Sequence, residues 1–385
     1  MNACRPRGLV HIAAGVDLGG VYDAGPYVDL TRLAERGALD FVTLGDSLGR
    51  PGPDALAVLS RAAPATARIG LVPTVTTTHA DPLHVRAAVA TLDRVSRGRA
   101  GWRIDVSTGT GDARLLGHGS AVPLDRLWRD AGEVADACAR LWDGGDGRDG
   151  GDGGGGGEDA AGMRDTATGR FVAPGEPRLV DFDGGDFDGG DFDGDVFAGD
   201  AFSVPGPSIV PRRPQGHPVT VVDATDPHAR DTAARYADVA LVAAPGPDRA
   251  AAVRAELRAA AGAYGRDPDT LRVFAALAVD LGGGEYAAEP GHGGGGPRPS
   301  PRGPLYRGGP VDLAELIAAW HETGAADGFH LTPVEPRRDL ERLVNGTVPL
   351  LQHRALFRSF YPGDTLREHL GLARPAPRYT PTRGH

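Results

Sequence analysis

The sequence predicts an α/β protein with the architecture of a (β/α)8 TIM barrel, and three observations support this. Eight short apolar segments rich in β-branched residues recur along the 385 residues. Helical periodicity runs between them, so strands and helices alternate. Polar side chains directly follow several of the strands, where a barrel carries its site. A doubly wound sheet is the competing architecture, and it would call for a Gly-x-Gly-x-x-Gly motif between a strand and a helix, which we do not find.

The eight expected strands are short and mostly apolar, as buried parallel strands are. They are Leu9–Ala13, Phe41–Leu44, Ile69–Val75, Ala100–Val106, Val219–Val222, Val239–Val242, Val273–Val279 and Gly328–Leu331. The expected helices carry apolar residues at helical spacing. They are Asp29–Arg36, Asp54–Ala63, Leu83–Val95, Leu124–Trp142, His228–Tyr236, Asp248–Tyr264 and Leu313–Thr323, with further helical segments toward Leu351.

The stretch Ile69–Ser107 shows the repeating unit most clearly. A β-branched run ends in the polar turn Thr76-Thr77-Thr78-His79, and Asp81-Pro82 then begins a helix, because Asp caps and Pro fits the first turn. Gly98 ends that helix, and a second apolar strand follows. This is a β-α-β unit, so its two strands should be parallel.

Composition narrows the range of functions. The chain has 51 acidic and 41 basic residues, a formal charge of −10, which argues against nucleic acid as a main partner. Two cysteines are too few for a disulfide framework and suit a reducing cytoplasm. We find no apolar run of the roughly 18–20 residues that a membrane span needs, and no signal peptide. The sequence therefore predicts a cytoplasmic protein without a membrane partner.

Two segments interrupt the barrel pattern in what we interpret as a single domain covering residues 1–385. Residues 143–214 form an insertion that contains the glycine-rich stretch 144–157 and the repeat DFDGG-DFDGG-DFDGD at 181–195. Such composition cannot offset the entropy of ordering the chain, so a solvated surface loop is expected. The repeat matches neither common calcium-binding pattern, and we expect no metal there. Residues 282–309, rich in Gly and Pro, are expected to form a second flexible loop.

Five stretches carry a resemblance to a known family. They are VPTVTTTHADPLHVRAAVATLDRVSRGRAGW, LAERGALDFVTLGDSL, FSVPGPSIVPRRPQGHPV, ARYADVALV and VPLLQHRALFRSFYPGDTLREHLGL. Together they resemble the bacterial-luciferase-like flavin-dependent monooxygenases, in the branch of nitrilotriacetate and dibenzothiophene-sulfone monooxygenases. The resemblance implies a luciferase-like barrel that uses reduced FMN from a separate flavin reductase on a small organic substrate. It also implies a homodimer formed through helices near the start of the chain, with Arg32, Arg61 and Arg86 as candidates.

The resemblance assigns cofactor-side roles to residues that follow the strands. Those implied near the flavin ring are Asp46, Thr76, Thr77 and Ser107. Ordinary turn chemistry explains the same residue types, since Asp, Ser and Thr are favoured there. Arg103, which stands where relatives have Asn, is a further cofactor-binding candidate; it could pair with Asp105 or hold an anion, and the sequence leaves both open.

The phosphate side departs from the family pattern. Relatives carry a Gly-Ser-Ser type turn that holds the FMN phosphate, and this chain has Asp223-Ala224-Thr225-Asp226-Pro227 there. Thr225 keeps one hydroxyl, whereas Asp226 would repel a phosphate unless Arg230 compensates. Trp128 replaces a tyrosine of the family. Weakened or rearranged FMN binding is the expectation.

Three histidines are candidates for acid–base catalysis, because imidazole titrates near neutral pH. His79 lies in the turn after the third strand, where a bystander is the alternative. His11 and His330 lie in the first and last strands, where a satisfied core histidine is the alternative. Two other functions stay open: a barrel that has lost flavin turnover and acts as a binding protein, and an oxidoreductase that uses the deazaflavin coenzyme F420.

Overall fold

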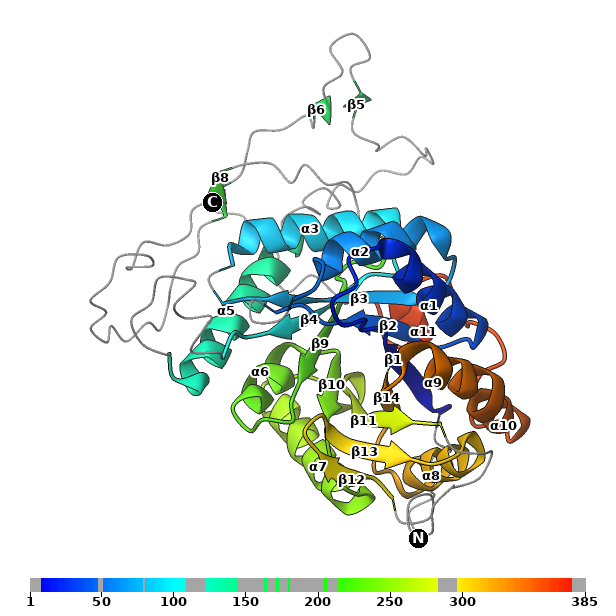
Figure 1. Cartoon of the computed structure of the whole chain (residues 1–385). Helices are drawn as coiled ribbons and strands as arrows, with labels where there is room; N and C mark the ends of the chain where they lie inside the picture. The colour runs from blue at the N-terminus through cyan, green and yellow to red at the C-terminus, as the bar shows by residue number, and fades with distance from the viewer. Residues whose placement is uncertain are drawn as a thin grey trace, which may run out of the picture.

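The computed structural model describes residues 8–47, 51–78, 80–108, 122–143, 214–282 and 296–375, together with four two-residue strands between residues 163 and 205. Eight parallel strands form a closed ring in the order β10-β9-β4-β3-β2-β1-β14-β11, which β10 and β11 complete by pairing with each other. Helices surround this ring on the outside (Figure 1). The predicted (β/α)8 barrel is confirmed.

The barrel strands begin and end within two residues of the predicted bounds. They are β1 (His11–Gly15), β2 (Phe41–Leu44), β3 (Gly70–Thr76), β4 (Gly101–Asp105), β9 (Val219–Asp223), β10 (Val239–Val242), β11 (Arg272–Asp280) and β14 (Gly328–Pro333). The short strands β5 (Met163–Arg164), β6 (Phe171–Val172), β7 (Leu179–Val180) and β8 (Val204–Pro205) pair as β5–β6 and β7–β8. The low-complexity segments 144–157 and 181–195 lie outside the described residues.

The helices are amphipathic and bury one face against the barrel. They are α1 (Ala24–Arg36), α2 (Ala55–Ala62), α3 (Pro82–Val95), α5 (Leu124–Asp143), α6 (Ala229–Tyr236), α7 (Pro247–Ala263), α8 (Pro310–Thr323), α9 (Pro336–Arg342), α10 (Val348–His353) and α11 (Leu366–His369), with a π-helical turn (Leu343–Thr347) between α9 and α10. The first helix starts earlier than predicted, because Asp23 accepts a hydrogen bond from Gly25 N and caps it. Arg86 on α3 is buried within the chain, whereas Arg32 and Arg61 are exposed, so Arg86 does not suit an interface.

The expectation of a flexible loop over residues 282–309 is wrong for its second half. Residues 298–300 and 303–307 form the antiparallel hairpin β12–β13 (Arg298–Ser300, Gly303–Arg307), and β13 also pairs in parallel with the end of β11. Tyr306 is fully buried and its hydroxyl donates to Gly309 O at 3.0 Å. Pairing and this aromatic anchor override the Pro- and Gly-rich composition. Residues 283–295 lie outside the described part of the chain.

The amino-terminal end of the barrel is closed by α11. Leu366 and Leu370 pack inside the ring with apolar residues such as Phe41, Val72 and Phe274. Strand β3 begins with Gly70, whose lack of a side chain makes this close packing possible. A Cβ at Gly70 would stand 2.6 Å from Leu366 Cδ1 and 2.8 Å from Phe41 Cβ. The interior at this end is therefore a packed core and has no place for a ligand.

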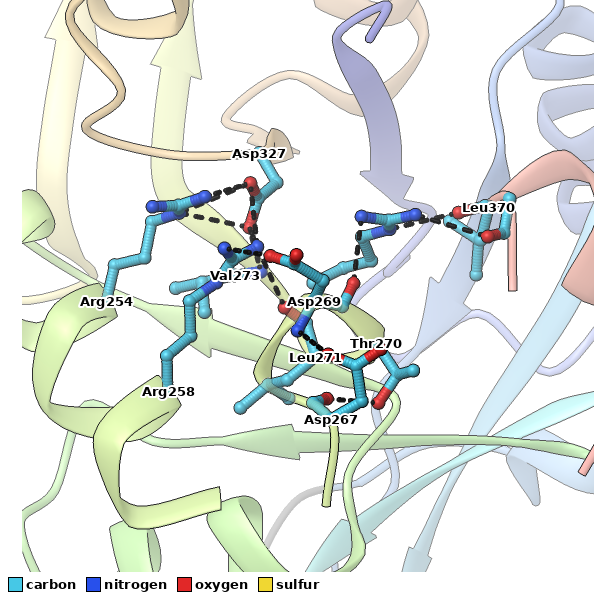
Figure 2. Close-up of polar contacts among 11 residues, drawn as sticks. Arg254, Arg258, Asp267, Asp269, Thr270, Leu271, Val273, Asp327 and Leu370 are labelled. Carbon is cyan, nitrogen blue, oxygen red and sulfur yellow. Dashed lines mark hydrogen bonds and ion pairs between the residues drawn. The ribbon is translucent and has the colours of Figure 1, made fainter. Parts of the chain in front are cut away.

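Three aspartates, Asp40, Asp238 and Asp327, hold this end of the barrel together. Each directly precedes a strand, β2, β10 or β14, and its carboxylate accepts an N–H from the neighbouring strand at 2.7–3.0 Å. Each is also paired with arginine, through Arg358, Arg367, or Arg254 together with Arg258. Figure 2 shows Arg254 and Arg258 reaching from α7 to Asp327. Because breaking a buried pair leaves an uncompensated charge, these contacts favour one closed arrangement.

The insertion leaves and rejoins the barrel at the same end. It follows Asp143, the last residue of α5, and the chain is described again from residue 214, just before β9. Asp143 Oδ1 and His217 Nε2 are 2.6 Å apart, and Gln215 bonds Asp93 and Ala100 O. Both flanks are thus fixed to the barrel next to each other, at the end opposite the carboxyl ends of the strands.

Candidate functional site

Polar side chains face the barrel interior in its carboxyl half. We call Thr43, Thr74, Arg103, Asp223 and His330 the interior polar cluster. Side chains alternate along a strand, so Thr43 lies two positions beyond the inward Phe41, and Thr74 is paired in register with Arg103. His330 Nε2 and Thr43 Oγ1 are 2.8 Å apart, and Arg103 Nη2 is 3.8 Å from Asp223 Oδ2. The sequence placed His330 among the candidates, and the structure brings it into this cluster.

His330 is an uncharged imidazole at neutral pH. Burial, followed by the charge of Arg103, lowers the pKa of His330 to about 3, while Asp223 opposes the shift. Strand β14 lies four strands from β4 in either direction round the ring, so His330 and Arg103 stand on opposite walls. A neutral imidazole can donate or accept one hydrogen bond per nitrogen, which suits positioning better than proton exchange at pH 7.

Arg103 forms an ion pair that the sequence did not reveal. Its partner is Asp223, at the end of the neighbouring strand β9, with 23% and 37% of the two side chains exposed. Burial raises the pKa of Asp105, although the charge of Arg103 works against this. Arg103 is thus paired with Asp223 and has a second acidic residue, Asp105, near it. The signal that could have identified Asp223 is its inward position near the end of a strand adjacent to β4.

Threonines join the ends of β3 and β4. Thr77 is 4% exposed, and its hydroxyl donates to Asp105 O at 3.1 Å. Thr78 Oγ1 accepts the Ser107 N–H at 2.9 Å. Thr76 is half-buried and paired in register with Asp105. Thr76, Thr77 and Ser107 therefore lie together at the rim, as predicted from their positions. His79, the next candidate along the turn, lies outside the described residues.

Asp46 sits after β2 in a capping contact. Its Oδ2 accepts the Ala55 N–H at 3.1 Å, at the start of α2, and burial raises the pKa of its carboxyl. Next to it, Asp17 Oδ1 accepts the Gly45 N–H at 2.8 Å. These contacts match the capped-turn alternative, and they leave Asp46 half-buried at the carboxyl end of the barrel.

The turn after β9 is stabilised by its own carboxylates. Thr225 N donates to Asp223 Oδ1 at 3.1 Å, and His228 N donates to Asp226 Oδ1 at 2.9 Å. The Thr225 hydroxyl accepts the Ala243 N–H at 2.9 Å. Two backbone N–H groups and one hydroxyl that a phosphate would use are thus engaged within the protein. This turn presents negative charge where the family resemblance implies a phosphate.

Three predicted residues lie away from the interior polar cluster. Arg230 makes two hydrogen bonds to Glu256 of α7, at 2.9 and 3.1 Å, so its guanidinium is directed to that helix. Trp128 is 5% exposed and belongs to the core among the helices. His11 lies at the amino-terminal end of β1, 2.8 Å from Asp40 Oδ1 and stacked on Phe274. A catalytic role for His11 does not fit this placement, because the packed core separates it from the rim.

The family follows from the sequence as a whole. The chain matches the profile described as "Luciferase-like monooxygenase" over residues 9–179 and 191–291. This covers more than half of the chain, and the chain belongs to the luciferase-like monooxygenase family. The predicted resemblance is confirmed. Among the helices that the structure describes, none combines the length and hydropathy needed to cross a lipid bilayer.

Individual relatives extend over nearly the whole chain. The protein is 27% identical to dibenzothiophene-sulfone monooxygenase of Rhodococcus erythropolis, with 91% of this chain and 90% of that protein covered. It is 27% identical to nitrilotriacetate monooxygenase component A of Aminobacter aminovorans, at the same coverages. The solved structure of EDTA monooxygenase from Chelativorans sp. BNC1 superimposes with a TM-score of 0.74 at 21% identity, over 95% of this chain and 99% of that one.

Proposed function

We propose that the protein is the oxygenase component of a two-component monooxygenase that uses reduced FMN on a small organic substrate. The observation that carries the proposal is the interior polar cluster at the carboxyl end of a luciferase-like barrel. The name of one relative, "component A", supports a second component, which we propose to be a flavin reductase. A cytoplasmic location and a homodimer are part of the same proposal.

The residues fit the ring of the cofactor better than its phosphate. Thr76 and Ser107 lie together at the rim, where their hydroxyls could meet the polar edge of the ring. The turn after β9 instead engages its N–H groups with Asp223 and Asp226. When bound, reduced FMN would supply the electrons that activate oxygen. We propose that this chain binds it weakly at the phosphate end.

The proposed roles of the protein residues follow from their positions. Thr76, Ser107 and Asp46 would border the ring at the rim, while Thr77 fixes the β3 turn against β4. His330, neutral and bonded to Thr43, would orient a ligand from the far wall. Roles for Thr225, Trp128 and Arg230 toward the phosphate, and for His79 as an acid or base, stay predictions.

Anaerobic absorbance titration of the purified protein separates the candidate functions. We expect saturable binding of reduced FMN, weaker binding of oxidised FMN, and no binding of coenzyme F420. Addition of a flavin reductase, NADH and oxygen should then support substrate oxidation. Preference for F420 would indicate the deazaflavin oxidoreductase, and binding of neither cofactor would indicate a barrel that acts as a binding protein.

A further inference from the structure

We propose that Thr74 and Arg103 form a subsite for an uncharged oxygen acceptor of the substrate, such as a carbonyl or amide oxygen. The inference deepens the proposed function and rests on it. Thr74 is only 4% exposed, and its hydroxyl has no partner among the described residues. A buried hydroxyl without a partner loses its hydrogen bond to water, so it is costly unless something else binds it.

Arg103 provides the second unpartnered group at the same place. It is paired in register with Thr74 on the adjacent strand, and both side chains point inward. Its Nε is buried and lacks a partner in the described part of the chain, while the side chain as a whole is 23% exposed. The two unpartnered groups thus come from residues that are neighbours across β3 and β4, and we propose that a ligand entering from the rim meets both. Two adjacent donors suit a single acceptor oxygen.

The surrounding charge selects an uncharged acceptor. Arg103 lies 3.8 Å from Asp223, longer than a charge-assisted hydrogen bond, so it is compensated but not tightly held. Asp105, on the same strand, adds a second acidic group beside it. Because Asp223 already offsets the charge of Arg103, the pair carries no net positive charge to bind a carboxylate. A carbonyl or amide oxygen can accept both hydrogen bonds without adding a negative charge.

The depth of the pair assigns the acceptor to the substrate. Thr74 lies two residues before Thr76, so it stands one inward layer, about 7 Å, below the rim. The other walls at this level carry apolar side chains, including Leu241 and Ala276, and His330 with Thr43. An organic molecule with one polar oxygen fits an apolar wall facing two donors. The flavin ring is the other source of such an oxygen, and the experiment separates the two.

The test uses Thr74→Val and Arg103→Lys in the full-length protein, with benzamide and benzoate as probes of one shape and different charge. Ligand-observed NMR should give benzamide about five-fold tighter binding than benzoate. Each substitution should weaken the binding of benzamide about five-fold, since Val has no hydroxyl donor and Lys lacks the planar guanidinium group. The affinity of Thr74→Val for reduced FMN, measured anaerobically, should stay within about two-fold. Equal or tighter binding of benzoate, or binding of neither probe, would overturn the subsite.

Thermal melts provide a readout that does not depend on any ligand. Thr74→Val should raise Tm by about 2 °C, because it removes an unsatisfied buried group. Thr43→Val is the matched control: its hydroxyl is bonded to His330, so its loss should lower Tm. A fall in Tm for both variants would show that Thr74 serves an ordered water, against the proposal. A ten-fold loss of reduced FMN affinity in Thr74→Val would assign the acceptor to the flavin instead. If the unmodified protein binds no reduced FMN yet prefers benzamide, only the proposed function fails.

Discussion

Replacing Asp40 by Asn should destabilise the barrel strongly. Asp40 is fully buried, and its carboxylate lies 2.8 Å from both Arg358 Nη1 and His11 Nδ1 while accepting the Ile12 N–H at 2.7 Å. Asp40→Asn keeps the shape but leaves the Arg358 charge buried without its counterion. Removing one partner of such a pair costs about 3 kcal/mol of unfolding free energy, and we expect a loss of that size at pH 7.

The pH dependence of this loss is the sharper part of the prediction. Burial by itself raises the pKa of Asp40, but Arg358, His11 and the Ile12 N–H outweigh it and lower the pKa to about 2. The folded-state pKa thus lies below the unfolded value, so the stabilisation is complete above about pH 4 and is lost as the pH falls through 2. The lowering corresponds to about 2 kcal/mol at neutral pH. The difference between the unmodified protein and Asp40→Asn should therefore narrow toward low pH.

Urea unfolding followed by tryptophan fluorescence, at several pH values from 7 to 3, measures both effects. The control is Asp364→Asn, which removes the exposed ion pair of Asp364 with Arg68; 81% of the Asp364 side chain is exposed. That change should cost less than about 1 kcal/mol, because surface pairs are well solvated. A double-mutant cycle with Arg358→Met should show coupling. A difference for Asp40→Asn that is the same at pH 7 and pH 3 would refute the electrostatic reasoning.

Four further outcomes are expected. Asp226→Ser should tighten FMN binding at least about ten-fold in a fluorescence titration, with Asp226→Asn giving part of the gain, because Ser can still accept the His228 N–H in the turn before α6 without adding a charge; an unchanged affinity would place Asp226 away from the phosphate. Replacing residues 144–213 by a short Gly-Ser linker should leave Tm within about 2 °C of that of the unmodified protein, since Asp143 and His217 already hold the two flanks together. Loss of cooperative unfolding in this variant would contradict the prediction. Limited proteolysis of the unmodified protein that does not cut within residues 144–213 would contradict it too. Light scattering should report a homodimer, and a monomer at micromolar concentration would count against it. The pH–rate profile should lack a His330 inflection between pH 5 and 8, since its pKa is about 3; an inflection that disappears in His330→Asn would argue otherwise.

The barrel strands were predictable because buried parallel strands are nearly continuous apolar runs. The apolar run Val239–Val242, for example, begins and ends at the same residues as the strand β10. The hairpin β12–β13 was not, because its Pro and Gly residues favour a loop and only pairing with β11 makes it a strand. Local composition cannot report a partner that lies elsewhere in the chain.

The site was predictable in position and less so in its contacts. Residues after β3 and β4 were placed at the rim because topology brings strand ends together. The pair of Arg103 and Asp223 spans 120 positions, so the sequence could suggest only the nearby Asp105. Asp226 shows the same limit, since its charge was evident and its hydrogen bond to His228 N within the turn was not. The direction in which a side chain points depends on its neighbours in space, and the spacing of residues along the sequence does not reveal them.

The closure of the barrel has a consequence for how the chain folds during synthesis. Strand β1 pairs with β14, and α11 fills the interior beneath them, so the ring and its core are complete only when residues up to Leu372 are present. Until then a nascent chain on the ribosome holds seven strands whose inner apolar faces lack their cover. Large domains expose such apolar surfaces transiently while they fold, and these surfaces bind chaperones and promote aggregation. Slow translation of the earlier strands would lengthen that exposure, whereas fast delivery of the segment after β14 would shorten it.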